Sequence, residues 1–148
     1  MDRDIGFLRS DADIAVDAIN QHILGKLPGH LGITFTELTR SGATAYIDIK
    51  PHHMAPNGFL HAGTVVTLAD TLAGLACTAT LPDTALGFTT IELKSNFFAT
   101  ATDGRIIGVA KPEHLGGTTQ VWDCEVTHRE SGKRLALFRC TQMVLKPR

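Results

Sequence analysis

The chain has 148 residues, of which 43% are hydrophobic, so it can bury a core of ordinary size and is not a disordered protein. Its 14 basic and 15 acidic residues nearly cancel and form no run of Lys and Arg, so we expect no nucleic-acid partner. Residues 1–16 lack the basic flank and apolar core of a signal peptide, which favours a cytoplasmic protein.

The first predicted element is an amphipathic helix over about residues 13–27, which Pro28-Gly29 ends. Two strands follow, over residues 33–38 and 43–49, because a turn that contains glycine separates two runs of strand-forming residues. An irregular segment, residues 51–61, then leads to the next element.

A long apolar helix is predicted over residues 63–80, where apolar residues cover most of the circumference. A run of this length is also typical of a membrane span. Its threonines and glycines and the charged Asp70 argue against contact with lipid. We therefore expect a helix enclosed by protein, and no membrane partner.

Asp70 is the one charged side chain in that helix. Burying an ionised carboxylate costs several kcal/mol unless it is paired or hydrogen-bonded, and its pKa otherwise rises. Such a group can act as a base or a nucleophile. The alternative is a carboxylate at a subunit or domain surface that binds a backbone amide.

Four strands joined by short turns are predicted after the helix, over residues 87–98, 105–113, 118–129 and 134–145. The order of elements favours an α+β fold in one domain, residues 1–148. In that fold a mainly antiparallel, curved sheet wraps around the long central helix.

Cys77, Cys124 and Cys140 are widely separated and lie in apolar strings, which favours reduced core thiols over disulfides or a zinc site. His52 and His53 lie close to a third histidine, but the nearest acidic candidates fall on other predicted elements. A metal site needs further ligands in a fixed arrangement, so we expect no bound metal.

The motif P-N-G-F-L-H-A-G, residues 56–63, runs directly into the central helix. A helix start leaves backbone N–H groups unpaired and carries a partial positive charge. The N–H groups of Ala62 and Gly63 can therefore stabilise a developing oxyanion. The alternatives are a tight strand-to-helix turn for the glycines and a helix cap or loop support for His61, and the two interpretations can hold together.

This motif, followed by T-V-V-T-L-A-D, resembles the hotdog-fold acyl-CoA thioesterases, in particular their phenylacetate-pathway and 4-hydroxybenzoyl-CoA branch. The signature of that branch is His-Gly-Gly with an acidic residue nine positions after the His, and His61 and Asp70 have that spacing. The resemblance extends over most of the chain. It implies a hotdog fold and the hydrolysis of an acyl-CoA, aryl or of short or medium chain, to a carboxylic acid and free CoA.

The resemblance also implies roles for the motif residues. Asp70 would be the nucleophile or the general base. The N–H group of Ala62, aided by Gly63, would polarise the thioester carbonyl, and His61 would orient that loop and the thiolate leaving group. The enzyme would need no metal or organic cofactor, because coenzyme A is part of the substrate.

Two further polar residues are candidate helpers. Thr90 matches a position at which some relatives have a Ser or Thr that binds the nucleophilic water, and only one of Thr89 and Thr90 can face the pocket. Family members often have Asn or Gln where this chain has Ala55. Asn57 either takes over that polar role or shapes the turn with its neighbouring glycine, and we favour the turn.

The binding of CoA and the assembly of subunits are the remaining expectations. The loop with His114, Gly116, Gly117 and Thr118 is predicted to contact pantetheine or phosphate, although a hairpin turn explains these residues equally well. The resemblance implies a homodimer, with Asp70 of one subunit facing Ala62 of the other, and tetramers are common in the family.

Two other functions compete with thioester hydrolysis. A hotdog dehydratase that acts on hydroxyacyl thioesters would use a His and an acid, but its proline-rich loop ahead of the helix is absent. A non-catalytic protein that binds acyl-CoA is the stronger rival, because Ala55 departs from the usual active site. The phenylalanines near the predicted pocket do not choose between aryl and aliphatic substrates.

Overall fold

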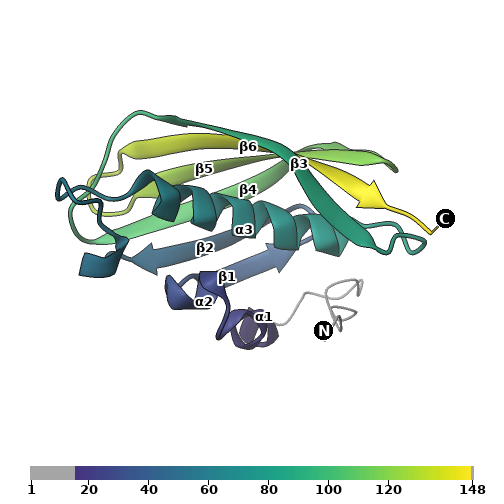
Figure 1. The fold of residues 1–148 in the computed structure, drawn as a ribbon, viewed down its shortest axis with the longest axis horizontal. Helices are drawn as coiled ribbons and strands as arrows, with labels where there is room; N and C mark the ends of the chain where they lie inside the picture. Colours follow the sequence, from purple (N-terminus) through teal and green to yellow (C-terminus); the bar gives the residue numbers. More distant parts are fainter. Residues whose placement is uncertain (1–15, 148) are drawn as a thin grey trace.

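The computed structural model describes residues 16–147. Six strands form one antiparallel sheet in the order β1-β2-β4-β5-β6-β3. They are β1 (Thr34–Thr39), β2 (Gly42–Asp48), β3 (Gly87–Phe97), β4 (Arg105–Leu115), β5 (Thr119–His128) and β6 (Arg134–Leu145). The sheet curves around the long helix α3 (Ala62–Thr80), which contacts every strand (Figure 1). The predicted α+β hotdog arrangement is confirmed.

Helix α3 fills the curve of the sheet with apolar side chains. Leu68, Ala69, Leu72 and Ala73 are fully buried, and they recur at the spacing that places residues on one helix face. The helix is long and apolar enough to cross a bilayer, but 56% of its apolar window is buried inside the protein. It is therefore the core helix that the sequence predicts.

The three cysteines are free thiols in this core, as predicted. Burial raises the pKa of each of Cys77, Cys124 and Cys140 to about 12. At neutral pH they are therefore protonated and behave as small apolar side chains.

The start of the described chain differs from the single predicted helix over residues 13–27. The structure has α1 (Val16–Ile23) and a second short helix α2 (Leu27–His30), and residues 13–15 lie outside the described part. The break falls at Gly25, whose φ of 71° is left-handed and suits glycine. Pro28 lies in the first turn of α2, where the missing N–H group costs nothing, so it does not end a helix there.

Strand β3 lies at one edge of the sheet and exposes large apolar side chains. Ile91 is 55% exposed, Leu93 43% and Phe97 47%. A β-bulge between Thr90 and Glu92 shifts the register, so that Leu93 lies beside the buried Cys140 of β6. An apolar edge of this kind is a site for pairing with another chain.

Candidate active site

His61 caps the N-terminus of α3. Its backbone is extended, with φ −68° and ψ 132°, and its Nδ1 accepts a hydrogen bond of 2.8 Å from the N–H group of Gly63. The helix-cap alternative for His61 is therefore what the structure shows. Nδ1 acts as the acceptor in this hydrogen bond, so it carries no hydrogen in this arrangement.

This cap changes the predicted set of oxyanion donors. The N–H group of Gly63 is engaged by His61, so the expectation that Gly63 offers a free donor is wrong for this arrangement. The N–H group of Ala62, by contrast, has no hydrogen-bond partner among residues 16–147. Ala62 is exposed at the positive end of a 19-residue helix, so one amide remains available for an anion or a polarised carbonyl.

Asp70 lies two helical turns further along α3 and is half-buried. Its Oδ1 is buried and has no hydrogen-bond partner within the described part of the chain. Burial raises the pKa of this carboxyl above its usual range. The alternative of a carboxylate bound to a backbone amide is not seen there, and an orphaned buried oxygen of this kind is typical of a functional site.

A pocket of about 270 Å³ opens beside Asp70. Thr90 shares the pocket, so of the two neighbouring threonines it is Thr90 that faces the site. The pocket is formed by residues of α1, the α1–α2 segment, α2, α3 and β3: His22, Ile23, Lys26, Pro28, Asp70, Thr71, Gly74, Leu75, Thr78, Phe88 and Thr90. Most of its lining is apolar, which suits an acyl group.

The wall between α3 and β3 depends on a glycine inside the helix. A Cβ atom at Gly74 would lie 3.2 Å from Cζ of Phe88, which is closer than ordinary packing. Glycine costs about 1 kcal/mol relative to alanine within a helix, so a reason for it here is needed. The close approach of the Phe88 ring to the backbone of α3 supplies that reason.

The remaining predicted residues lie away from this pocket. Oδ1 of Asn57 accepts a 3.3 Å hydrogen bond from the N–H group of Phe59, which supports its role in the turn. The segment with His114, Gly116, Gly117 and Thr118 forms the β4–β5 hairpin, where the N–H group of Gly116 donates to Thr119 at 3.0 Å. The hairpin explanation therefore holds for this loop, and its contact with CoA stays a prediction.

A single chain does not bring the candidate groups together. Eight residues separate Ala62 from Asp70 on one helix, which is about 12 Å along its axis. The β4–β5 hairpin lies near the other end of α3, since Gln120 bonds to Thr80 at 3.0 Å. A site that uses the amide of Ala62 and the carboxylate of Asp70 on one small group therefore requires a second copy of the chain.

Sequence reasoning missed the contribution of α1 and α2 to the pocket. His22, Ile23, Lys26 and Pro28 line it because α2 packs against α3 and α1 packs against β1 and α2. The contacts of α1 with β1 and of α2 with α3 are long-range and have no local signal in the sequence. Within residues 16–147 no group of three or more His, Cys, Asp or Glu side chains is placed to hold a metal ion.

Replacing Asp70 by Asn is expected to stabilise the fold at neutral pH. Since the pKa of Asp70 is raised, the folded state keeps the proton at pH values at which the unfolded chain has lost it, and stability falls as pH rises through that window above 3.8. An amide has no such cost. Each kcal/mol gained raises Tm by about 2–4 °C in a chain of this size.

Thermal unfolding of both proteins at pH 7.5 and near pH 4 measures this effect. The gain in Tm should be present at pH 7.5 and shrink toward pH 4, where Asp70 itself is protonated. A variant that melts no higher than the parent at pH 7.5 would show that the ionised carboxylate of Asp70 does not destabilise the folded state.

Comparison with known proteins gives a consistent family. A model of the thioesterase superfamily matches residues 57–134, more than half of the chain. A 1,4-dihydroxy-2-naphthoyl-CoA hydrolase from Escherichia coli is 32% identical over 135 residues, which cover 89% of this chain and 96% of that protein.

Solved structures agree with this match. A thioesterase from Haemophilus influenzae superposes with a TM-score of 0.84 at 25% identity, over 93% of this chain and 95% of that one. The PaaI protein of the phenylacetic acid degradation operon of E. coli has the same fold, with a TM-score of 0.75 at 21% identity over 86% of this chain and 90% of that one.

Proposed function

Because the chain belongs to the thioesterase superfamily, we propose that it hydrolyses an acyl-CoA thioester to a carboxylic acid and free CoA. One observation carries the proposal. The buried oxygen of Asp70 has no partner in the described residues, and it lies beside an apolar pocket of about 270 Å³. A carboxylate left unpaired in such a place is suited to act on a substrate.

The proposed reaction uses two groups of α3, the N–H group of Ala62 at its start and the carboxylate of Asp70 two turns further along. The N–H group of Ala62 donates to the thioester carbonyl and stabilises the oxyanion that forms when the carbonyl carbon is attacked. As a general base, Asp70 takes a proton from the attacking water, the C–S bond breaks, and the thiolate of CoA regains a proton. As a nucleophile, Asp70 would instead form an acyl anhydride that water hydrolyses. Thr90 lines the same pocket. In this proposal its hydroxyl group binds the attacking water.

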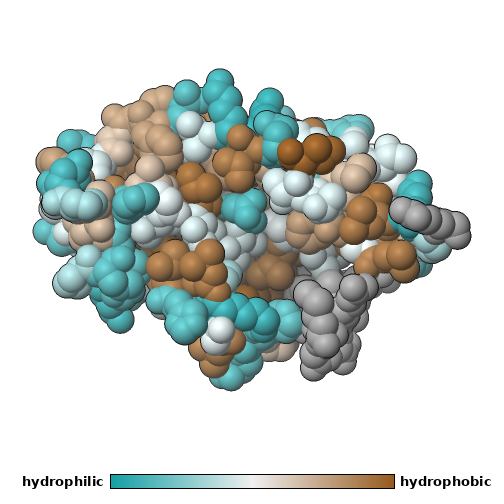
Figure 2. All heavy atoms as spheres, viewed as in Figure 1, coloured by the Kyte–Doolittle hydropathy of each residue, from teal (hydrophilic) through white to brown (hydrophobic). Residues whose placement is uncertain are grey.

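Two copies of the chain form the site in this proposal. One face of α3 is half-exposed, at Val66, Thr67, Asp70, Thr71 and Gly74, and lies beside the exposed apolar side chains of β3. On this face of the molecule, Figure 2 shows several groups of hydrophobic residues with residues of intermediate and hydrophilic colour between them. A homodimer that covers this face and sets the α3 helices antiparallel brings Asp70 of one copy toward Ala62 of the other, and such dimers can pair into tetramers.

The substrate class is an acyl-CoA with an aryl or a short or medium-chain acyl group. The apolar lining, which includes Phe88, accepts either kind. The relative named for an aromatic acyl-CoA supports the aryl group. In this proposal the enzyme acts in the cytoplasm, and it requires no metal or organic cofactor.

Incubation of the purified chain with benzoyl-, phenylacetyl-, hexanoyl- and octanoyl-CoA, while free thiol is followed, tests the proposal. We expect release of CoA thiol from at least one of the four, and no release by the Asp70→Asn variant. Binding without thiol release would instead show a non-catalytic acyl-CoA-binding protein. The presence of Ala55, where family members often have Asn or Gln, favours that alternative. A change in acyl-group absorbance from a hydroxyacyl-CoA without thiol release would show a dehydratase.

A further inference from the structure

His53 is a fully enclosed histidine outside the pocket. It ends the 3-10 turn Pro51–His53 and is 1% exposed. Its Nδ1 accepts a 2.9 Å hydrogen bond from the N–H group of Lys50, and its Nε2 lies 2.9 Å from the carbonyl oxygen of Leu31. A backbone N–H can only donate and a carbonyl can only accept, so the ring is neutral with its hydrogen on Nε2.

The backbone of the same residue holds the start of α3. The carbonyl oxygen of His53 accepts a 3.0 Å hydrogen bond from the N–H group of His61 and another, also 3.0 Å, from Oγ1 of Thr64. These two contacts lie on either side of Ala62 in the chain. The direction in which the free amide of Ala62 points therefore depends on where His53 is held.

The ring of His53 also connects the His61–Ala62 turn to a segment that lines the pocket beside Asp70. Leu31, which accepts from the ring, directly follows α2, and Pro28 of α2 lines the pocket beside Asp70. One buried side chain thus connects a segment that lines the pocket beside Asp70 of the same copy to the turn that, in the proposed dimer, presents the amide of Ala62 to the partner's pocket.

We propose that His53 is a positioning residue for thioester hydrolysis, which fixes the His61–Ala62 turn and the residue 27–31 segment relative to each other. The proposal rests on the proposed function for its effect on catalysis. In the proposed dimer the amide of Ala62 serves the partner's pocket, and a displacement of such a donor by about 1 Å can lower a rate by roughly 100-fold.

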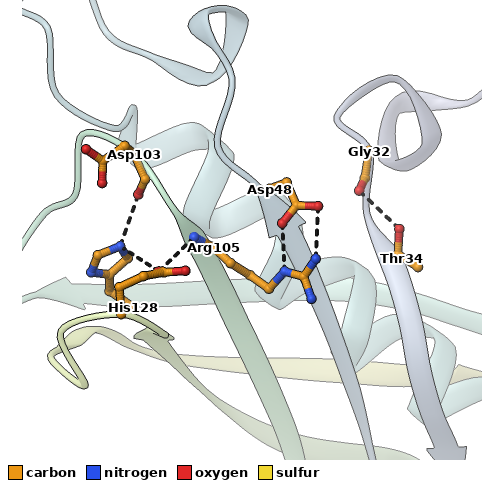
Figure 3. A network of polar contacts seen from close by, with 7 residues as sticks. Gly32, Thr34, Asp48, Asp103, Arg105 and His128 are labelled. Carbon is orange, nitrogen blue, oxygen red and sulfur yellow. Dashed lines mark hydrogen bonds and ion pairs between the residues drawn. The ribbon is translucent and has the colours of Figure 1, made fainter.

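Burial, together with the charges nearby, keeps His53 neutral. The ring borders a polar hollow of about 320 Å³ whose titratable groups are His30, Asp48, Lys50 and His52. Asp48 is not available as a counter-ion, because both of its oxygens bind Arg105, at 2.6 and 3.0 Å (Figure 3). Burial in the first place, and then the nearby His52, lower the pKa of His53 below its usual 6.5.

The sign of the pH effect follows from this neutrality. Below pH 6.5 the unfolded chain binds a proton that folded His53 resists, so this contribution to stability is complete above pH 6.5 and is lost as pH falls below it. A proton on Nδ1 would also remove the acceptor for the N–H group of Lys50.

Three variants test the proposal: His53→Leu, His53→Gln and, as the matched control, His52→Leu at the exposed neighbour. Leucine offers neither hydrogen bond, whereas the glutamine amide offers one acceptor and one donor. We expect His53→Leu to lower kcat by roughly 10- to 100-fold with a smaller change in KM. His53→Gln should recover most of the loss, and His52→Leu should match the parent.

Amide hydrogen exchange gives a readout that does not depend on activity. His53→Leu should speed exchange at both residues 61–65 and residues 31–33, and His52→Leu at neither. Parental kcat or unchanged exchange in His53→Leu, or a Gln variant no better than the Leu variant, overturns the proposal.

If the parent releases no CoA from any acyl-CoA, the proposed function fails. Amide hydrogen exchange then tests by itself whether His53 holds the two segments together. If His53→Leu does not fold, His53→Asn is measured in its place at pH 7.5, because its shorter amide cannot reach both Lys50 and Leu31. Selective loosening of both segments supports the proposal, and uniform exchange overturns it.

Discussion

The Asp70→Asn variant is expected to bind acyl-CoA like the parent but to lose turnover, with kcat lower by roughly 10²–10⁴-fold. Oδ1 of Asp70 is buried beside the pocket and has no protein partner in the part of the chain that the structure describes. Asparagine keeps the shape of this side chain but cannot take a proton or act as a carboxylate nucleophile. Release of thiol under saturating substrate measures kcat, and calorimetry measures binding.

Asp83→Asn is the matched control, because Asp83 is an exposed carboxylate in the turn that follows α3. It should keep the parental kcat. If the Asp70→Asn variant turned over substrate as fast as the parent, Asp70 would have no part in the mechanism.

The Ala62→Pro variant is expected to lower kcat by roughly 10²–10³-fold, the usual result of losing one oxyanion donor, about 2.7–4 kcal/mol. Proline removes the one N–H group in question and nothing else that the helix needs. Ala62 is the first residue of α3, a position at which proline is favoured, and His61 before it already has the extended backbone that a following proline requires.

Ala62→Gly is the control for this variant, since it removes the methyl group but keeps the N–H group. Thiol release is compared at equal helix content, measured by circular dichroism. A proline variant with folded structure and nearly parental kcat would mean that the oxyanion is stabilised elsewhere.

Much of the fold could be predicted because its signals are local. The strand bounds follow the turns that glycines mark, and the predicted strand over residues 134–145 is the observed β6. The break of the first helix at Gly25 was not predicted, because the apolar spacing continues across it while the backbone there turns left-handed.

The candidate site could be predicted in part. Asp70 could be identified from the sequence because burying a lone carboxylate in an apolar helix costs free energy, which indicates a functional role. The hydrogen bond from Gly63 to His61 depends on a side-chain rotamer, and the role of His53 depends on contacts with Leu31, 22 residues away. Neither of these two contacts leaves a pattern in the sequence. The predicted contacts with CoA stay predictions.

The measurement that tests the shared site most directly is complementation between two inactive subunits. Asp70→Asn and Ala62→Pro chains carrying different tags are co-expressed, and the mixed dimer is purified through both tags. If Asp70 of one copy acts with Ala62 of the other, a mixed dimer has one site with both groups intact and one with neither. We predict about half of the parental thiol release per dimer, far above either variant alone. Activity of the mixed dimer no higher than that of its two parent variants would contradict a site shared between subunits.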